Sequence, residues 1–262
     1  MASFIEKWRE AVRVKNSCLC VGIDPAHTGQ RQEQSLASSI DKLEWTASII
    51  EKVAPFAAAI KLNRNYYKDL SQADMQRLNR LIHQQQILSI DDSKLADIGE
   101  TNDTGLYHAA EEGFDSVTYA PFPGNIGETA AFAKDRGIGL IMLVLMSNPE
   151  YELIKNASIQ GMRAFEYFAR QAAKHQIEAV VVGAPSPKNH VMIDELQTIL
   201  SILNPDQLVL VPGVGAQGGN LEPLVETFGD RAMINVGRSI IYHDDPAGEA
   251  QRLQAQINRY RR

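Results

Sequence analysis

Three charged side chains lie close together in the chain, where an apolar run ends. Residues 90–98 read Ile-Asp-Asp-Ser-Lys-Leu-Ala-Asp-Ile, which places Asp92 and Lys94 two residues apart. Residues two apart on a β-strand face the same side, so we expect both side chains to enter one cavity. Asp97 lies beyond the predicted strand, on a loop or a first helical turn, and need not face that cavity.

A second lysine, Lys61, follows the apolar run Phe-Ala-Ala-Ala-Ile at residues 56–60. A charge that ends an apolar strand is costly unless it is paired. We therefore expect Lys61, Asp92 and Lys94 to pair across neighbouring strands. The Asp-x-Lys pattern by itself is equally compatible with catalysis and with a structural salt-bridge network at the rim of a barrel.

Two glycine-bearing segments indicate a phosphate site. Residues 212–220 read Pro-Gly-Val-Gly-Ala-Gln-Gly-Gly-Asn, and residues 235–240 read Asn-Val-Gly-Arg-Ser-Ile. Glycine lets the backbone approach an anion, and Arg238 can add a bidentate charged contact. In barrel enzymes, the loops after strands seven and eight commonly hold phosphate through backbone N–H groups at a helix N-terminus. We therefore expect a phosphorylated ligand.

Two polar residues at other strand ends have two possible roles each. Asp24, in Gly-Ile-Asp-Pro at residues 22–25, can accept hydrogen bonds from sugar hydroxyls or can serve the turn beside Pro25. Ser147 follows an apolar run and can offer its hydroxyl to a ligand or cap the next turn. For Ser147 taken alone, the pattern favours the capping role.

Short apolar, β-branched runs alternate with longer amphipathic stretches along the whole chain. The predicted strands are residues 18–25, 57–63, 87–94, 116–120, 139–146, 179–183, 208–213 and 233–237. Apolar residues recur at helical spacing between them, at Ile40, Leu43, Ala47 and Ile50, at Met162, Phe165, Phe168 and Ala169, and at Ile193, Leu196, Leu200 and Leu203. Nearly continuous apolar strands are typical of a parallel sheet buried on both faces.

This alternation predicts an α/β protein with a single (β/α)8 TIM barrel that spans residues 1–262 as one domain. A short helix capped by Ser3, with Phe4, Ile5 and Trp8 on one face, precedes the first strand. Proline and glycine gather at the predicted carboxyl ends of the strands, which is the rim where barrel enzymes carry their active sites.

Composition excludes several classes of function. The chain of 262 residues has a net charge of -6 and a pI near 5.6, which argues against non-specific nucleic-acid binding. No apolar stretch is long enough for a membrane span, and the charged N-terminus is unlike a signal peptide. Cys18 and Cys20, two apart in one predicted strand, are poorly placed for a disulfide, so we expect a reducing cytoplasm. The six scattered histidines indicate no metal site, and there is no Walker A or dinucleotide-binding motif.

The order of these motifs resembles the orotidine 5′-monophosphate decarboxylases, over most of the chain. The most specific part is the pattern Asp-x-Lys-x-x-Asp-Ile-x-x-Thr that begins at Asp92. The resemblance implies a catalytic charged tetrad: Lys61, Asp92, Lys94 and Asp97. It also implies these substrate-binding residues: Asp24, Ile98, Thr101, Ser147, Pro212, Gln217, Gly237 and Arg238.

The same resemblance implies a reaction and an assembly. Orotidine 5′-monophosphate would be converted to UMP and CO2 in pyrimidine biosynthesis, with Lys94 protonating C6 and with no cofactor and no metal. The enzyme would be a homodimer in which Asp97 and Thr101 reach the neighbouring subunit's site. Residues 61–67 are similar to the Lys-Pro-Asn-x-Ala-Phe-Phe run of the longer bacterial form. Leu62, Asn65 and Glu100 depart from the family pattern, which leaves fine specificity open but touches no tetrad position.

Two alternatives stay open at this point. Related barrel enzymes that act on sugar phosphates, such as 3-keto-gulonate-phosphate decarboxylase and hexulose-phosphate synthase, share Asp-x-Lys-x-x-Asp but use magnesium. The continuation from Ile98 to Thr101 and the glycine-rich loop from Pro212 favour the nucleotide enzyme. A non-catalytic ligand-binding paralogue is the second alternative, and an intact charged tetrad argues against it.

Overall fold

A closed barrel of parallel strands forms the centre of the protein. The computed structural model describes residues 2–214 and 219–261, and within them eight strands pair in the order β1-β10-β9-β8-β5-β4-β3-β2. The strands are β1 (Leu19–Ile23), β2 (Ala59–Leu62), β3 (Leu88–Leu95), β4 (Ser116–Tyr119), β5 (Gly139–Leu145), β8 (Ala179–Val182), β9 (Leu208–Val211) and β10 (Ala232–Val236). Most of their residues are buried, because side chains fill the barrel and helices cover its outer wall. The predicted (β/α)8 barrel is confirmed.

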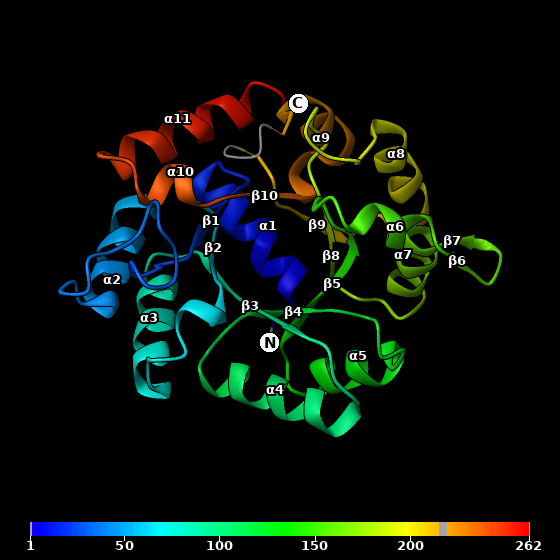
Figure 1. The fold of residues 1–262 in the computed structure, drawn as a ribbon, viewed down its shortest axis with the longest axis horizontal. Helices are drawn as coiled ribbons and strands as arrows, with labels where there is room; N and C mark the ends of the chain where they lie inside the picture. The colour runs from blue at the N-terminus through cyan, green and yellow to red at the C-terminus, as the bar shows by residue number, and fades with distance from the viewer. Residues whose placement is uncertain (1, 215–218, 262) are drawn as a thin grey trace.

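Helices form the outer layer of this barrel (Figure 1). They are α2 (Lys42–Val53), α3 (Gln72–Gln84), α4 (Gly99–Glu111), α5 (Ile126–Asp135), α7 (Ala164–Lys174), α8 (Ile193–Ile202), α9 (Leu221–Phe228) and α11 (Pro246–Asn258). Shorter segments lie between strands and helices: η1 (Arg64–Tyr66), α6 (Tyr151–Asn156), η2 (Gly229–Arg231) and α10 (Arg238–Ile241). Each barrel strand is thus followed by helical structure before the next strand begins, which is what a parallel sheet requires.

The first helix, α1 (Phe4–Lys15), covers one end of the barrel. Ser3 caps it in a capping box, and Phe4 and Trp8 are buried, as the sequence predicts. The Trp8 indole donates to the carbonyl of Asp230 at 2.7 Å, and Lys7 pairs with Asp115 at 2.7 Å, directly before β4. Figure 1 shows α1 (dark blue) lying across the middle of the ring of strands. Because Asp115 precedes its strand, α1 closes the amino-terminal end and leaves the carboxyl ends of the strands open.

The predicted helices begin and end slightly differently in the structure. Ile40 lies before α2 and is 42% exposed, because Asp41 caps the helix by accepting from the backbone N–H of Glu44. Met162 belongs to a short antiparallel hairpin, β6 (Ser158–Ile159) with β7 (Met162–Arg163), that the apolar spacing did not predict. Gly161 at the turn of this hairpin has a φ of +80°, a conformation that glycine adopts without strain.

Cys18 and Cys20 are both buried and unpaired at β1. Burial raises the pKa of each thiol to about 12, so both stay protonated at neutral pH. Among the described helices, none combines the length and the apolar character that a membrane crossing needs.

Candidate active site

A carboxylate held between two ammonium groups lies at the carboxyl ends of β2 and β3. Lys61 Nζ donates to Asp92 Oδ2 at 2.5 Å, and Lys94 Nζ donates to Asp92 Oδ1 at 2.6 Å. Lys61 and Asp92 are both only 7% exposed, whereas the Lys94 side chain is more open. The pairing across neighbouring strands that the sequence predicts is therefore present. Charge-assisted contacts of this length are among the stronger hydrogen bonds in proteins.

These contacts fix the charges of the cluster. Burial by itself would raise the pKa of Asp92, but the charges and hydrogen bonds of Lys61 and Lys94 hold it well below its usual range. Burial likewise opposes the charge on Lys61, but Asp92 and, more weakly, Asp24 raise the pKa of this lysine above its ordinary value. Asp92 is consequently an anion and Lys61 a cation at neutral pH.

The strand that carries Asp92 and Lys94 is irregular where they lie. Asp91 pairs with Val117 of β4, but the next pair is Leu95 with Tyr119, so β3 advances four residues while β4 advances two. The additional residues form a bulge, which re-aims side chains at the end of a strand. Lys94 has a φ of +53°, which is uncommon for a residue other than glycine. The two charged residues therefore meet through a bulge rather than through the regular alternation that the sequence predicts.

A cavity of about 230 Å³ opens beside the charged cluster. Lys61, Asp92 and Lys94 line one side of it. Apolar residues from three other strands also line it: Leu143, Val181 and Leu210. Ser147 and Pro212 lie at its edge, after β5 and β9, and both positions were predicted to contact a ligand. An apolar cavity with a few converging charged groups is the usual form of a small-molecule site.

A second cavity, of about 150 Å³, adjoins the first and shares Lys61, Pro212 and Asn235 with it. Asp24, Gly237 and Arg238 line this second cavity, so the predicted sugar-binding and phosphate-binding residues are brought together. The Oδ1 atom of Asp24 is buried and has no hydrogen-bond partner among the described residues. A buried acceptor without a partner is costly unless a ligand supplies a donor.

Gly237 is needed where β10 ends, because the backbone of β1 passes very close to it. A Cβ atom at residue 237 would come within 2.9 Å of the Gly22 carbonyl oxygen. Any larger residue would push the two strand ends apart and open the wall of the second cavity. This close approach is the physical reason for the glycine that precedes Arg238.

Three predicted residues do not join the cluster within this chain. Asp97, Ile98 and Thr101 lie between β3 and the first turn of α4, are exposed, and line neither cavity. The side chain of Asn102 holds the backbone of Asp97, donating to its carbonyl at 2.7 Å and accepting from its N–H at 3.1 Å. The loop is therefore fixed in place while the Asp97 carboxylate stays accessible. Gln217, another predicted ligand contact, lies outside the described residues.

Several polar cavity residues escaped the motif-based prediction. Thr118 on β4 and Asn235 on β10 line the cavities, and both are polar residues in largely buried strands. Such a residue at the carboxyl end of a barrel strand is the signal that would have identified them, because an unpaired polar group in a buried strand is unfavourable. Asn148, next to Ser147, also lines the cavity beside the charged cluster.

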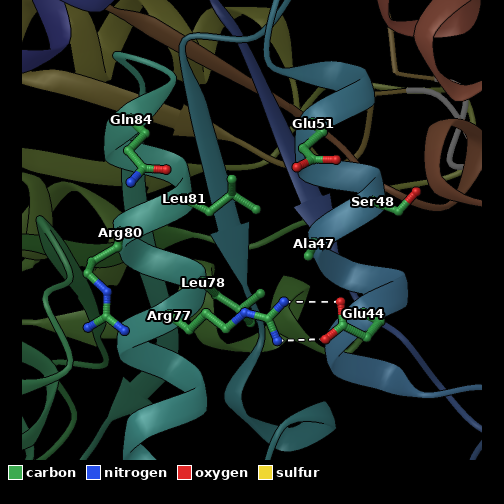
Figure 2. A pocket seen from close by; sticks show the side chains of 9 residues that line it. All are labelled: Glu44, Ala47, Ser48, Glu51, Arg77, Leu78, Arg80, Leu81 and Gln84. Carbon is green, nitrogen blue, oxygen red and sulfur yellow. Dashed lines mark hydrogen bonds and ion pairs between the residues drawn. The ribbon is translucent and has the colours of Figure 1, made fainter.

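A separate groove of about 340 Å³ lies on the outer wall between α2 and α3 (Figure 2). Arg77 spans it and pairs with both carboxylate oxygens of Glu44, at 2.6 and 3.1 Å. The groove shares no lining residue with the two cavities at the strand ends. An exposed ion pair of this kind contributes little to stability and offers no catalytic constellation.

The chain matches known proteins over nearly its whole length. Residues 17–253 match the model of the "Orotidine 5'-phosphate decarboxylase / HUMPS family". The orotidine 5′-phosphate decarboxylase of Dehalococcoides mccartyi is 28% identical over 99% of this chain and 98% of that protein. The enzyme of the same name from Polaromonas naphthalenivorans is 31% identical over 95% of this chain and 92% of its own length. The fold is also similar to the crystal structure of a putative orotidine-monophosphate-decarboxylase from Toxoplasma gondii, with a TM-score of 0.85, 23% identity, and coverage of 98% and 96% of the two chains.

A second acidic residue, Asp91, is buried on β3 next to Asp92. It accepts a hydrogen bond from the Ser93 hydroxyl. Burial raises the pKa of Asp91 from 3.8 to about 7, although that hydrogen bond and the charge of Arg64 favour the ionised form. The charges of Glu112 and Asp92 add to the rise. Asp91 is therefore partly protonated at neutral pH while its neighbour Asp92 is fully ionised.

Replacing Asp91 with asparagine should stabilise the protein at alkaline pH. The unfolded chain ionises Asp91 near pH 4, whereas the folded protein does so near pH 7, so the contribution of Asp91 to native stability falls as the pH rises between these values. Asp91→Asn removes this effect and should gain about 1 to 3 kcal/mol relative to the parent at pH 8, but little at pH 4. Urea unfolding followed at both pH values measures the difference.

Asp115→Asn is the matched control for this measurement. Burial would raise the pKa of Asp115, but the hydrogen bond and charge of His83 and the hydrogen bond of Lys7 hold it below its usual value. Asp115→Asn should therefore lose stability at pH 8 rather than gain it. Equal stability changes for Asp91→Asn at the two pH values would contradict the assignment.

Proposed function

Because the chain belongs to the orotidine 5′-phosphate decarboxylase / HUMPS family, we propose that it converts orotidine 5′-monophosphate to UMP and CO2 in pyrimidine biosynthesis. It is an enzyme of the carboxy-lyase class, like the relatives that carry this name. One observation carries the proposal for this chain. The paired Lys61, Asp92 and Lys94 line an apolar cavity that adjoins the cavity of Arg238, so that a charged reaction centre and a phosphate-binding cation face one ligand.

The two cavities suit the two halves of this nucleotide. We assign the base and its carboxylate to the cavity beside Asp92, with Ser147 at the pyrimidine edge and Pro212 as a wall beside the ring. The ribose hydroxyls are suitable donors for the unpaired Oδ1 of Asp24. The phosphate is assigned to Gly237 and Arg238. The family resemblance adds Gln217, which lies outside the described residues.

Lys94 is the proton donor in this mechanism. The bond between C6 and the carboxylate breaks, CO2 leaves, and the electron pair remains on C6. Lys94 Nζ, which already lies 2.6 Å from Asp92, then gives its proton to C6 and forms UMP. Lys61 holds the other carboxylate oxygen of Asp92 and thereby keeps this carboxylate turned toward Lys94. No step uses a cofactor.

Electrostatic stabilisation by Lys94 supplies most of the rate enhancement in this mechanism. A substrate carboxylate about 4 Å from Asp92 is repelled by roughly 4 kcal/mol at an effective dielectric constant near 20, and loss of CO2 relieves that repulsion. The larger contribution comes from an ammonium group fixed in advance beside the carbon on which negative charge develops. Phosphate binding at Arg238 contributes binding energy remote from the reacting carbon.

The proposal includes a homodimer. Asp97, Ile98 and Thr101 are exposed in a loop whose backbone Asn102 holds, and Ile98 is 70% exposed although it is apolar. Contact with a second copy of the chain would bury Ile98 and bring Asp97 and Thr101 to the neighbouring site. We assign Asp97 and Thr101 to the partner's site, Ile98 to substrate binding, and the whole of residues 1–262 to one decarboxylase domain. The buried, unpaired Cys18 and Cys20 fit a reducing cytoplasm.

Removing the Lys94 side chain should abolish turnover and leave the fold intact. Lys94 is partly exposed, and Asp92 keeps its contact with Lys61 in Lys94→Ala, so the protein should still fold. We expect kcat to fall by about 1,000-fold or more, because both the proton and the stabilising charge are lost. The decrease in orotidine monophosphate absorbance measures the rate. Lys134→Ala, at an exposed position on α5, is the control, and near-parental activity of Lys94→Ala would refute the mechanism.

Chelation distinguishes this reaction from the magnesium-dependent reactions of related barrel enzymes. The described residues include no group of three or more His, Cys, Asp or Glu side chains that could hold a metal ion. Turnover of orotidine monophosphate should be unchanged after dialysis against excess EDTA and after magnesium is added back. Loss of activity with EDTA that magnesium restores would favour a sugar-phosphate reaction instead.

Mixing two inactive variants tests the shared site. Lys94→Ala removes the proton donor of its own subunit, whereas Asp97→Ala damages the site of the partner. In an equal mixture with free subunit exchange, half of the dimers contain one of each, and about a quarter of all sites should be intact. Activity should therefore rise from near zero to about 25% of the parental rate. If Asp97 serves its own subunit, the mixture stays inactive.

A further inference from the structure

Thr118 contacts both charged residues of β3. The residue lies on β4, is almost fully buried, and lines the cavity beside the charged cluster. Its hydroxyl oxygen accepts a hydrogen bond from the backbone N–H of Lys94 at 2.9 Å. The same hydroxyl donates to Asp92 Oδ1 at 3.1 Å, with the carbonyl of Asp91 farther away at 3.4 Å. One hydroxyl thus contacts the backbone of the proposed proton donor and the carboxylate that orients it.

The bulge in β3 explains why a side chain is needed here. Between the pairs Asp91–Val117 and Leu95–Tyr119 the two strands lose their common register. Inside this bulge the backbone N–H of Lys94 donates to the Thr118 side chain on β4. Without that hydroxyl the N–H would lose its partner, and the left-handed conformation of Lys94, with a φ of +53°, would lose the contact that holds it.

We propose that Thr118 is a positioning residue of the decarboxylation, one that fixes the bulged end of β3 so that Lys94 and Asp92 hold their reactive arrangement. This inference rests on the proposed function. Asp92 accepts hydrogen bonds from Lys94 and Thr118 on Oδ1 and from Lys61 on Oδ2, so its carboxylate is held from three neighbouring strands. Thr118 acts through these two residues and takes no part in bond making.

The experiment compares three substitutions of Thr118 with a control on the same strand. Thr118→Val keeps the volume and removes the hydroxyl, Thr118→Ser keeps the hydroxyl, and Thr118→Ala serves if the valine variant does not fold. Ser116→Ala is the control, because Ser116 is fully buried two residues earlier on β4 and its hydroxyl has no partner among the described residues. Steady-state rates with orotidine monophosphate and hydrogen exchange of residues 88–95 are measured for each.

A positioning role predicts a split between kcat and KM. Thr118→Val should lower kcat by about 10- to 100-fold, the effect of losing a hydrogen bond to a charged group. KM should change by less than about 3-fold, since the ligand contacts remain. Thr118→Ser should stay within about 3-fold of the parent in both constants. Exchange at Lys94 should accelerate in Thr118→Val and Thr118→Ala but not in Ser116→Ala, because only the first two free its N–H.

Several outcomes would overturn the inference. A parental kcat in Thr118→Val or Thr118→Ala would do so, as would an equal loss in Ser116→Ala, which would reveal a general packing effect. Unchanged exchange at Lys94 would show that the hydroxyl does not hold the bulge. A parental protein that does not decarboxylate orotidine monophosphate would instead refute the proposed function. Hydrogen exchange at Lys94 would then still test whether Thr118 holds the bulge.

Discussion

The ion pairs of Asp92 with Lys61 and Lys94 are the interaction on which the rest of the structure depends. Asp92 is 7% exposed, and a carboxylate removed from water is stable only when its partners stay in contact. Breaking a buried pair by removing one partner typically costs about 3 to 5 kcal/mol, because an uncompensated charge is left behind. Lys61 comes from β2 and Thr118 from β4, on either side of the strand that carries Asp92. Three adjacent strands must therefore keep their positions relative to one another.

The barrel holds these strands in place because one end is closed and packed, while the other end carries the cavities. Closure leaves no free sheet edge, and α1 seals the amino-terminal end through Trp8 and the pair of Lys7 with Asp115. The opposite end carries the cavities, and buried ion pairs outside the barrel hold its loops. Lys155 of α6 contacts Glu195 of α8 at 2.8 Å, which ties the segment after Ser147 to the outer helices. Irregular backbone at the rim is tolerated because the rest of the barrel is fully packed.

Sequence periodicity predicts the barrel well, because the apolar runs of the strands and the amphipathic spacing of the helices are both local patterns. Apolar runs and amphipathic spacing indicate where strands and helices lie, and the cost of an unpaired Lys61 predicts its pairing with Asp92. The bulge that twists Lys94 is not encoded in any short pattern, because it depends on how β3 and β4 mismatch in register. Thr118 becomes significant only once that mismatch is known. Asp97 could be separated from the cluster because it lies beyond the predicted strand, and its role in a neighbouring site is part of the proposed dimer.

In the proposed dimer, that second copy changes the charge of the site. Within one chain the cluster holds two lysines and one aspartate, a net charge of +1 that would bind the substrate carboxylate well in the ground state. Strong ground-state binding of the group that must leave does not accelerate its departure. Asp97 from the partner would cancel the excess charge and leave Lys94 to act on the negative charge that develops at C6. Assembly would then change the site from one that favours a carboxylate into one that favours its loss, which ties catalysis to the interface by electrostatics as well as by geometry.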